Sequence, residues 1–542
     1  MEEARREGTR PLIQAPQEVA PPLIQAPTAK ERKYDRQLRL WAASGQRALE
    51  ESHVLLVIGE STQGSNSSVA GIETLKNLIL PSIGSFTIAD AAIVQEADLG
   101  INFFLEPASL GKSRAEEAKR LLSELNPDVT GHAIVKPLAD WLPVQDSLKA
   151  YNLIILCAPV EAQHLQRLCS YSSQSAVPLI YLQSVGFYSS FSIQLPAEFP
   201  IVDTHPDPES TTDLRLFAPW PELEAAVEAL GDATKLPDHD HGHIPYLLIL
   251  LYYLKQWHRQ HGSYPSDFKE KTAFRDTVRA AARTNNAEGG EENFDEASAA
   301  VLKTVAPPPI GQGCKDMFAM DSCTSVSADS ANFWIIAHAI KTFYDRHSAL
   351  PLPGSLPDMK ATSAGYIQLQ NIYKSKARKD VAEVTATVRA LEKAQARPSP
   401  IADSEIELFC KNASHVRVLT NPDKLAVPAL RLNSAAETTI AKIQTILDLD
   451  WENMLPVFIG LNSAGLPKST ISLTEDEEKQ EAIANSIAEV ERMEGGELHN
   501  ISSVTGGIVA QEAIKLLTRQ YVPVDGTAVY DGIRAKLAVF RL

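Results

Sequence analysis

The sequence predicts an α/β domain into which a large, mainly helical domain is inserted. Three observations support this prediction. Short apolar runs alternate with helix-like segments between about residues 33 and 200, the pattern becomes mostly helix-like up to about residue 490, and the remaining residues return to a helix followed by short strands. Strands that alternate with helices predict a parallel sheet with crossover helices. One α/β domain would then both open and close the chain.

The elements of the predicted α/β domain follow from hydrophobic periodicity. Four apolar runs predict strands: "HVLLVIG", "SFTIAD", "NLIILCAP" and "VPLIYLQ". The segments "IETLKNLIL" and "KSRAEEAKRLLSEL" have helical spacing. Near the end of the chain, "SSVTGGIVAQEAIKLLTRQ" predicts a helix with small residues on one side, which suits close packing. The runs "TAVYDG" and "KLAVFRL" predict a closing β-hairpin.

Four segments make up the predicted domain organisation. The N-terminal residues contain "PLIQAP" twice, at 11–16 and 22–27, and their proline content predicts disorder. The helical region includes "PYLLILLYYLKQW", "ANFWIIAHAIKTFYD" and "KDVAEVTATVRALEKA". The expected boundaries are 1–30 for a disordered tail, 31–200 for the first part of the α/β domain, 201–490 for the helical insertion and 491–542 for the closing part.

Composition excludes some classes of function. A formal net charge of −17 argues against a nucleic-acid-binding protein, which would normally present a basic face. The most lipid-like stretch, Ile244–Leu254, is far shorter than the roughly 20 residues of a membrane-spanning helix. No signal peptide is visible, and the five cysteines form no CxxC pair. We therefore expect reduced thiols, no zinc site, and a cytoplasmic or nuclear location.

Five stretches, in order, carry a resemblance to one family. They are "KYDRQLRLWAASGQRAL", "LILPSIGSFTIAD", "LGKSRAEEAKRLLSELNPDV", "VPLIYLQ" and "GGIVAQEAIKLL". Together they resemble the activating enzymes of ubiquitin-like proteins and their bacterial adenylating relatives. This resemblance implies a Rossmann-like adenylation domain of the ThiF/MoeB type. Further stretches, such as "PGSLPDMKATSAGYIQLQNIYKSKARKDVAEV", resemble the non-catalytic subunits of the heterodimeric members and extend the match through most of the helical region.

The loop after the first predicted strand departs from a nucleotide-binding pattern. Adenylating members have a glycine-rich loop there, because glycine lets backbone N–H groups approach phosphate closely. Here Gly59, Gly64 and Gly71 are separated by "ESTQ" and "SNSSVA", which is the wrong spacing. Asp90 is at the strand end where the family has an acid for the ribose, but it comes 31 residues after Gly59 rather than about 20. The loop is therefore enlarged, and a solvated loop is favoured over an anion site.

The next family segment, D-x-D-x-V-x-x-S-N-L-x-R-Q, corresponds to "DAAIVQEADLGINFF". By this resemblance Ala92 replaces the second acid, Asp98 the phosphate-facing Asn, and Ile101 the Arg that neutralises developing charge. Pro159 stands where the family has its Mg²⁺-binding Asp. Arg114 matches a phosphate-binding Lys, but a lone cation is weak support for a site. The resemblance thus implies an inactive half, with no metal or cofactor bound by this chain.

No cysteine has the full context of a thioester nucleophile. Catalytic members have Pro-x-Cys-Thr, whereas Cys323 precedes Thr324 but has Asp321 two residues before it. We expect that carboxylate to raise the thiol pKa and weaken nucleophilicity. A structural thiol is therefore favoured at Cys323, and Cys157, within an apolar run, is expected in the core.

The segment "YDRQLRL" is the most informative remnant of the family pattern. In the family, the Arg of its R-Q pair contacts the ATP phosphates in the partner subunit, so the resemblance implies that Arg36 acts in trans. It also implies a homologous catalytic partner that holds ATP, Mg²⁺ and the thioester cysteine. The ubiquitin-like modifier and, indirectly, its conjugating enzyme would be further partners. The alternative for Arg36 is an ordinary solvated charge on an amphipathic helix.

Three rival interpretations remain at this point. The main one is a self-sufficient, ATP-dependent adenylating enzyme of the same family with an atypical phosphate loop. A second is the non-catalytic subunit of the sumoylation enzyme, which is generally shorter and lacks so large an insertion. The third is a dinucleotide-dependent oxidoreductase, which the glycine spacing and the closing helix disfavour.

Overall fold

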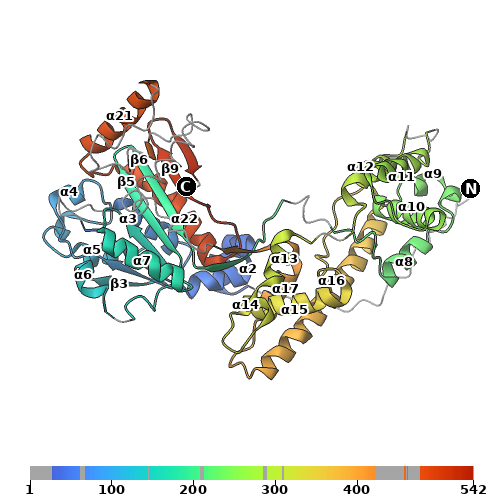
Figure 1. Ribbon diagram of the computed structural model, residues 1–542, viewed down its shortest axis with the longest axis horizontal. Coiled ribbons are helices and arrows are strands. Elements are labelled where there is room, and N and C mark those ends of the chain that lie inside the picture. The colour runs from blue at the N-terminus through green and yellow to red at the C-terminus, as the bar shows by residue number, and fades with distance from the viewer. Residues whose placement is uncertain are drawn as a thin grey trace, which may run out of the picture. The chain divides into compact units, whose positions relative to one another are not determined.

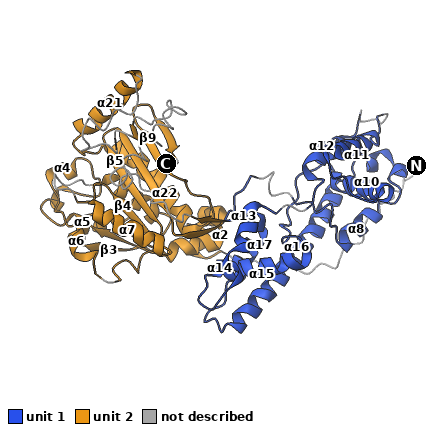
Figure 2. Cartoon of the chain, viewed as in Figure 1, with its two compact units in different colours: residues 1–26, 202–417 blue, residues 27–201, 418–542 orange. Residues whose placement is uncertain are grey.

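A computed structural model describes residues 27–60, 68–144, 146–207, 213–284, 290–307, 310–420, 457–458, 461 and 477–540. The "PLIQAP" repeat, Gly64 and most of the predicted tail lie outside these residues. The chain divides into two compact units: Val202–Arg417 belongs to unit 1, and Pro27–Ile201 with Val418–Leu542 belongs to unit 2 (Figure 2). Each unit is described separately.

Unit 2 is built on an eight-stranded mixed sheet with the order β10-β9-β6-β5-β4-β1-β2-β3 (Figure 1). The five strands from β3 to β5 are parallel, whereas β6, β9 and β10 are antiparallel to their neighbours. The strands are β1 (His53–Val57), β2 (Ser85–Ala89), β3 (Thr130–Ile134), β4 (Leu153–Cys157), β5 (Leu179–Val185), β6 (Tyr188–Gln194), β9 (Thr527–Asp531) and β10 (Lys536–Phe540). The predicted α/β fold and the closing hairpin are confirmed.

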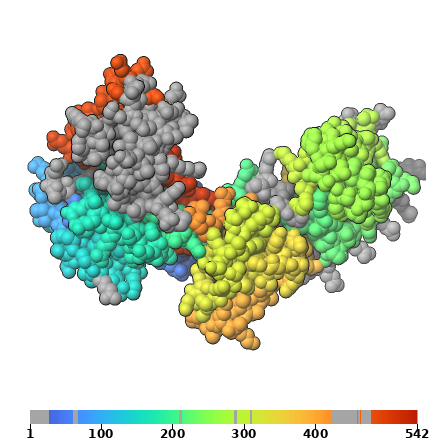
Figure 3. Space-filling view, in the orientation of Figure 1, coloured from blue at the N-terminus to red at the C-terminus, as the bar shows by residue number. Residues whose placement is uncertain are grey.

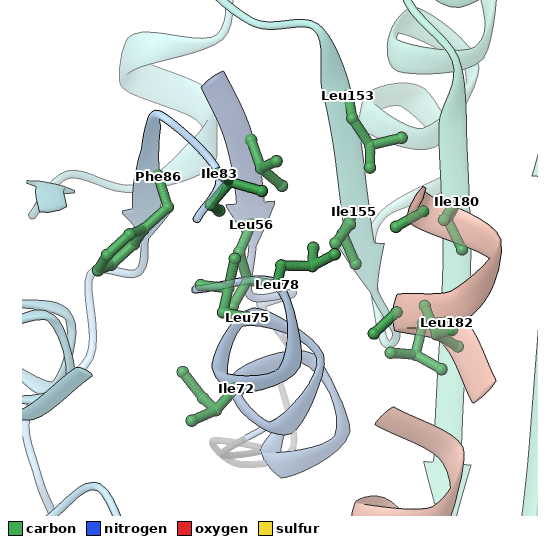
Figure 4. Packing of buried hydrophobic residues seen from close by; sticks show 14 of the residues in the cluster. Leu56, Ile72, Leu75, Leu78, Ile83, Phe86, Leu153, Ile155, Ile180 and Leu182 are labelled. Carbon is green, nitrogen blue, oxygen red and sulfur yellow. The ribbon is translucent and has the colours of Figure 1, made fainter. Parts of the chain in front are cut away.

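Both faces of this sheet are covered, so successive residues of the central strands enter different cores. Val54 and Leu56 of β1 lie in a cluster with α3 (Val69–Ile79), α5 (Arg114–Ser123) and α22 (His499–Thr518). Leu55 and Val57 lie in another cluster with α6 (Leu138–Trp141) and α7 (Ala162–Gln174). Figure 4 shows Leu75 and Leu78 of α3 facing the sheet in the first cluster. This packing explains why β1 and β4 are continuous apolar runs.

Helix α22 crosses the same face as α3 and packs closely against it. A Cβ atom on Gly506 would lie 2.7 Å from Cβ of Glu73 and 2.9 Å from the backbone N of Thr74. Small hydroxyl side chains connect α22 to the sheet: Ser189 and Thr505 are 2.6 Å apart, and Ser184 and Ser502 are 3.2 Å apart. The predicted close packing of this helix is therefore made by its small residues.

A third cluster of buried residues shows that the α/β domain resumes before residue 490, the expected boundary. Helix α21 (Glu477–Arg492) contributes Ile483, Ile487 and Val490, which pack with residues of β5, β6, β9 and β10. Phe458 is fully buried in the same cluster. These segments therefore belong to the α/β unit, and the chain returns to unit 2 at Val418. The rest of 421–476 lies outside the described residues.

Unit 1 is mainly helical. Its helices of eight residues or more are α8 (Pro221–Glu228), α10 (Tyr246–His261), α11 (Phe268–Ala280), α12 (Glu292–Thr304), α13 (Gln312–Ala319), α15 (Asn332–His347), α16 (Ser363–Ala394) and α17 (Asp403–Lys411). They form two groups along α16, which appear as green and yellow-to-orange masses in Figure 3. Strands β7 (Glu198–Val202) and β8 (Val416–Thr420) form a small second sheet, and most of their residues belong to unit 2. Throughout the described residues, helices are too short or too polar to span a membrane.

The remaining described helices are short or lie at the start of the chain. They are α1 (Ala29–Lys33), α2 (Asp35–Glu50), α4 (Glu96–Leu99), α9 (Asp238–His241) and α14 (Asp321–Thr324). Helix α2 has non-helical backbone angles at Trp41 and Ala42, so it consists of two helical segments joined at a kink.

Candidate functional site

The first strand–helix connection of a Rossmann-like domain is where an anion would bind, at the N-terminus of the helix. Here that position is the start of α3, after β1 and residues 58–68. Gly59 lies two residues after the end of β1, and a Cβ atom there would be 1.9 Å from the carbonyl oxygen of Pro159 and 2.3 Å from that of Cys157. Gly59 therefore permits close approach of two backbone segments, and Pro159 contributes a carbonyl rather than a carboxylate.

Gly71, in the first turn of α3, has a similar packing role. A Cβ atom there would be 2.6 Å from Sγ of Cys157 and 2.7 Å from Cδ1 of Leu56. Glycine therefore lets the helix lie close to strands β1 and β4, which is one of the known roles of glycine in this connection. The two described glycines of the enlarged loop are both explained by packing.

A carboxylate from the far end of the chain occupies the N-terminus of α3. The backbone N–H of Val69 donates to Oε2 of Glu497 at 2.5 Å, across 428 positions of sequence. Glu497 is 6% exposed. Burial raises its pKa to about 7, although the backbone N–H groups of Val69 and Ala70 and the positive charge of Arg114 act to lower it. A carboxyl group of this chain thus lies where the fold would place an external anion.

Three of the predicted site residues come together as a buried charged cluster. Nε of Arg114 is 2.6 Å from Oδ2 of Asp90, and its Nη1 is 3.1 Å from Oδ1 of Asp98. A further bond joins Nη2 to Oδ1 of Asp90 at 3.2 Å. All three residues are at most 5% exposed. Burial lowers the pKa of Arg114, but the two aspartates outweigh this effect and leave that pKa raised.

Backbone groups complete the partners of these carboxylates. The N–H of Ala92 donates to Oδ1 of Asp90 at 2.9 Å, and the N–H of Gln95 donates to Oδ2 of Asp98 at 2.8 Å. Asp90 and Asp98 therefore fix the backbone after β2 as well as Arg114. The guanidinium of Arg114 is directed at its own chain's carboxylates rather than at a phosphate.

Ile101 contributes its backbone to this region. Nδ1 of His499 is 2.9 Å from the carbonyl oxygen of Ile101, so the imidazole N–H donates to it. The ring of His499 also stacks on Phe103, with 3.8 Å between ring centroids. The segment that follows Asp98 is thereby attached to the first residue of α22.

Arg36 makes no hydrogen bond or ion pair with the described residues of this cluster. It is exposed near the start of α2. Its neighbour Arg39 pairs with Asp35 at 3.0 Å, whereas Arg36 forms no ion pair with any described residue. Its positive charge is thus available at the surface of unit 2.

All five cysteines are buried. Burial raises the pKa of Cys323 to about 11, with smaller opposing effects from Lys341 and Asp345. The expected structural role of this thiol agrees with its environment, but the cause differs: desolvation, rather than Asp321, dominates the shift. The described part of the chain has no group of three or more His, Cys, Asp or Glu residues that could hold a metal ion.

Sequence reasoning missed Glu497. The only local indication of a special role is the position of Glu497 two residues before α22, in "GGELHN". Nothing in that sequence indicates a contact with the first strand–helix connection. Among the residues that the structure describes at this position, the side chains do not fit a bound adenylate with Mg²⁺. The helix N-terminus holds Glu497, the guanidinium of Arg114 is engaged by two carboxylates, and Pro159 offers no side-chain ligand.

Comparisons with known proteins agree on one family. The ThiF family model matches residues 34–542. The chain is 34% identical over 544 aligned positions to the NEDD8-activating enzyme E1 regulatory subunit of Danio rerio, covering 95% of this chain and 99% of that protein. The Nedd8-activating enzyme E1 regulatory subunit of Drosophila melanogaster is 32% identical, with 95% and 98% covered. The regulatory subunit of Saccharomyces cerevisiae is 26% identical, with 94% and 100% covered.

Proposed function

This chain belongs to the ThiF family, among the NEDD8-activating enzyme E1 regulatory subunits, and we propose that it serves as the non-catalytic half of a heterodimeric activating enzyme for that modifier. The observation that carries the assignment is the near end-to-end match, in which the chain covers 99% of a regulatory subunit. The match includes the helical insertion as well as the α/β domain. No observation favours the self-sufficient enzyme over this interpretation.

The catalytic steps belong to the partner in this proposal. A homologous catalytic subunit binds ATP and Mg²⁺, adenylates the C-terminus of the modifier, and carries the cysteine that takes the modifier as a thioester. This chain binds no cofactor or metal of its own. Support comes from Glu497 on the helix N-terminus and from the enclosure of Arg114 by Asp90 and Asp98. Burial of the five cysteines further supports a thioester cysteine outside this chain.

The contribution of this chain to the chemistry is Arg36. We propose that its guanidinium enters the ATP site of the partner and neutralises charge on the phosphates, as a cation supplied in trans. Its exposure and its lack of an ion pair among the described residues suit that role. A charge already held by a carboxylate of its own chain would be less available.

Unit 1 has a separate role in the proposal. Its helices form part of the modifier-binding cleft, and the assembled enzyme passes the modifier to its conjugating enzyme. The acidic net charge of the chain would complement a basic face of the modifier. The enzyme would act in the cytoplasm, the nucleus or both.

One set of assays tests the proposed function. The chain, the catalytic subunit and the co-purified pair are each given ATP, Mg²⁺ and modifier, and ATP–pyrophosphate exchange and thioester formation are measured. We expect both activities in the pair, none in this chain alone, and co-elution of the two subunits. Robust exchange by this chain alone would establish the self-sufficient enzyme instead.

A further inference from the structure

Unit 1 has an open pocket among its described helices. The pocket lies between the C-terminal end of α8, the segment that leads through α9 into α10, and the first turns of α16. Its floor includes Leu230, Leu248 and Leu369, which are at most 7% exposed and belong to the core of this unit. The pocket has a volume of about 60 Å³. That is room for roughly four or five water-sized groups, which suits the four-carbon side chain of a leucine or an isoleucine.

Two half-buried polar side chains also line this pocket, and both come from the segment around α9. They are the carboxylate of Asp240 and the imidazole of His243. Nδ1 of His243 is 2.7 Å from the carbonyl oxygen of His239, so the ring N–H donates to that carbonyl. In the neutral ring, Nε2 is then an acceptor. The pocket therefore suits an apolar side chain that is accompanied by a positive charge and a backbone N–H donor.

The sequence before Pro27 contains a segment with these properties. In "TRPLIQAPQ", the basic Arg10 directly precedes the first "PLIQAP" copy, in which Leu12 and Ile13 are the large apolar residues. The second copy, at 22–27, has the same apolar pair but follows a proline instead of an arginine. Proline fixes φ and favours extended backbone, so a proline-flanked segment loses less conformational entropy when it binds. The first copy therefore matches the pocket in both apolar character and charge.

We propose that the first "PLIQAP" copy docks into this pocket of its own chain, with Leu12 or Ile13 on the apolar floor and Arg10 beside Asp240. The charges of Arg10 and Asp240 are complementary. Positions 12 and 27 are 15 apart, so the extended chain reaches up to about 50 Å from the start of the described residues. A tethered segment that reaches its site has an effective concentration on the order of 1 mM, so a weak contact is sufficient for occupancy.

Binding of a labelled synthetic peptide to the full chain, measured by fluorescence polarisation, tests this inference. The peptide covers residues 8–18. The full chain is either natural or a serine variant that combines Leu12→Ser, Ile13→Ser, Leu23→Ser and Ile24→Ser. In the natural chain the tail competes with the peptide, whereas in the serine variant the pocket is open. For a peptide Kd on the order of 100 μM, a tether of about 1 mM effective concentration predicts roughly tenfold tighter apparent binding to the serine variant.

Two further substitutions, made in the serine variant, locate the bound peptide. Ala229→Trp fills the pocket from an exposed position at the end of α8, and it should weaken peptide binding roughly tenfold or more because the apolar side chain of the peptide loses its place. Ala273→Trp is the matched control, because Ala273 is exposed on α11 and does not line the pocket. Peptide binding should be unchanged in this control.

Asp240→Asn tests the charge contact and replaces Ala229→Trp if that variant does not fold. It should weaken binding of the natural peptide roughly two- to fivefold, as expected for a partly exposed ion pair. A peptide with Arg10→Gln should bind equally to the chains with Asp and with Asn at position 240, because the pair is already broken.

Equal binding of the peptide to the natural chain and to the serine variant would overturn docking of the tail. Peptide binding that Ala229→Trp and Asp240→Asn both leave unchanged would overturn the pocket as its site, and a serine variant that binds no peptide would overturn both. Self-association of the natural chain that the serine variant lacks, measured by sedimentation, would assign the pocket to the tail of a second copy instead. The assay contains neither ATP nor a catalytic subunit, so its result does not depend on the proposed function.

Discussion

Arg114 has contacts that differ from those its position in the sequence predicts. Its position in the sequence resembles a phosphate-binding cation, but its guanidinium is 2% exposed and bonded to Asp90 and Asp98. Loss of one partner from a buried ionic group leaves an uncompensated charge, which typically costs about 3–5 kcal/mol. The cluster therefore holds the backbone after β2 in place, and its described contacts stabilise the fold.

Arg36 is the residue whose removal should affect chemistry and not folding. We expect Arg36→Ala to leave the Tm of this chain and its pairing with the catalytic subunit unchanged, because the side chain is exposed and makes no ion pair among the described residues. If Arg36 has the proposed role in trans, ATP–pyrophosphate exchange by the pair should fall roughly tenfold or more, because the variant lacks a preorganised charge near the reacting phosphates. Arg39→Ala is the control, and equal exchange rates for the two variants would contradict the role in trans.

Glu497 should make stability depend on pH in a particular direction. Its folded-state pKa, about 7, is above the usual value of 4.5. Between these values the folded chain binds a proton that the unfolded chain does not, so stability falls as pH rises through this window. Glu497→Gln lacks this proton and should gain up to about 3 kcal/mol relative to the natural chain between pH 5 and pH 8.

Urea unfolding of the natural chain and Glu497→Gln at several pH values measures the difference. Glu491→Gln, which changes an exposed acid, should follow the natural chain across the same range. A constant difference between the natural chain and Glu497→Gln from pH 5 to pH 8 would show that Glu497 has an ordinary pKa in the folded state.

At the scale of elements, helix α22 has two adjacent glycines, Gly506 and Gly507, that differ in environment. A Cβ atom on Gly506 would crowd α3, whereas one on Gly507 would meet no atom within 4 Å. We expect Gly506→Ala to destabilise the chain by about 1–3 kcal/mol through overpacking. Gly507→Ala should instead stabilise it by up to about 1 kcal/mol, because alanine has the higher helix propensity.

Denaturant unfolding of the two variants compares positions that share one helix and one substitution. Changes of opposite sign in the free energy of unfolding would distinguish the effect of packing against α3 from the effect of helix propensity. Equal stabilisation by both substitutions would show that α22 can move away from α3 at no cost.

The elements predicted from the sequence are those with the clearest apolar patterns. Strands β1, β2, β4 and β5 are buried and apolar, and the hairpin β9–β10 joins two short, mostly apolar runs across a turn. Strand β3, "TGHAI", is too polar to be distinguished, and β6, "YSSFSIQ", has serines that contact α22 and β9. Hydrophobic periodicity cannot identify a strand whose buried face is made of hydroxyl groups.

The candidate site was predictable in part. The family pattern located Asp90, Asp98 and Arg114. The replacements at Ala92, Ile101 and Pro159 predicted a loss of phosphate chemistry. Their bonding to one another could not be predicted, because it depends on how β2, α4 and α5 meet in space. Glu497 was beyond prediction for the same reason, since its partner is 428 positions away. The boundary at 490 failed because the apolar side of α21 fits a helical domain as well as the edge of a sheet.

At the scale of the whole molecule, each unit has a core of its own. Phe274 is buried in a cluster of unit 1, and Phe86 is buried in a cluster of unit 2. A buried Phe→Ala substitution costs about 3–5 kcal/mol. We expect calorimetry to resolve two transitions, with Phe274→Ala lowering the Tm of one and Phe86→Ala lowering that of the other. A single transition lowered equally by both variants would show that the units unfold as one cooperative body.

The pairing of β6 with β9 has a consequence for synthesis on the ribosome. Ser192 of β6 contacts Thr527 of β9, and these residues are 335 positions apart. At about 5–20 residues per second, roughly 17–67 seconds separate their translation. During that interval the nascent chain presents β6 without its neighbour and α3 without α22, while the whole of unit 1 emerges and can fold. The first half of the α/β domain thus has an unpaired strand edge and an uncovered helix face until the last strands are made.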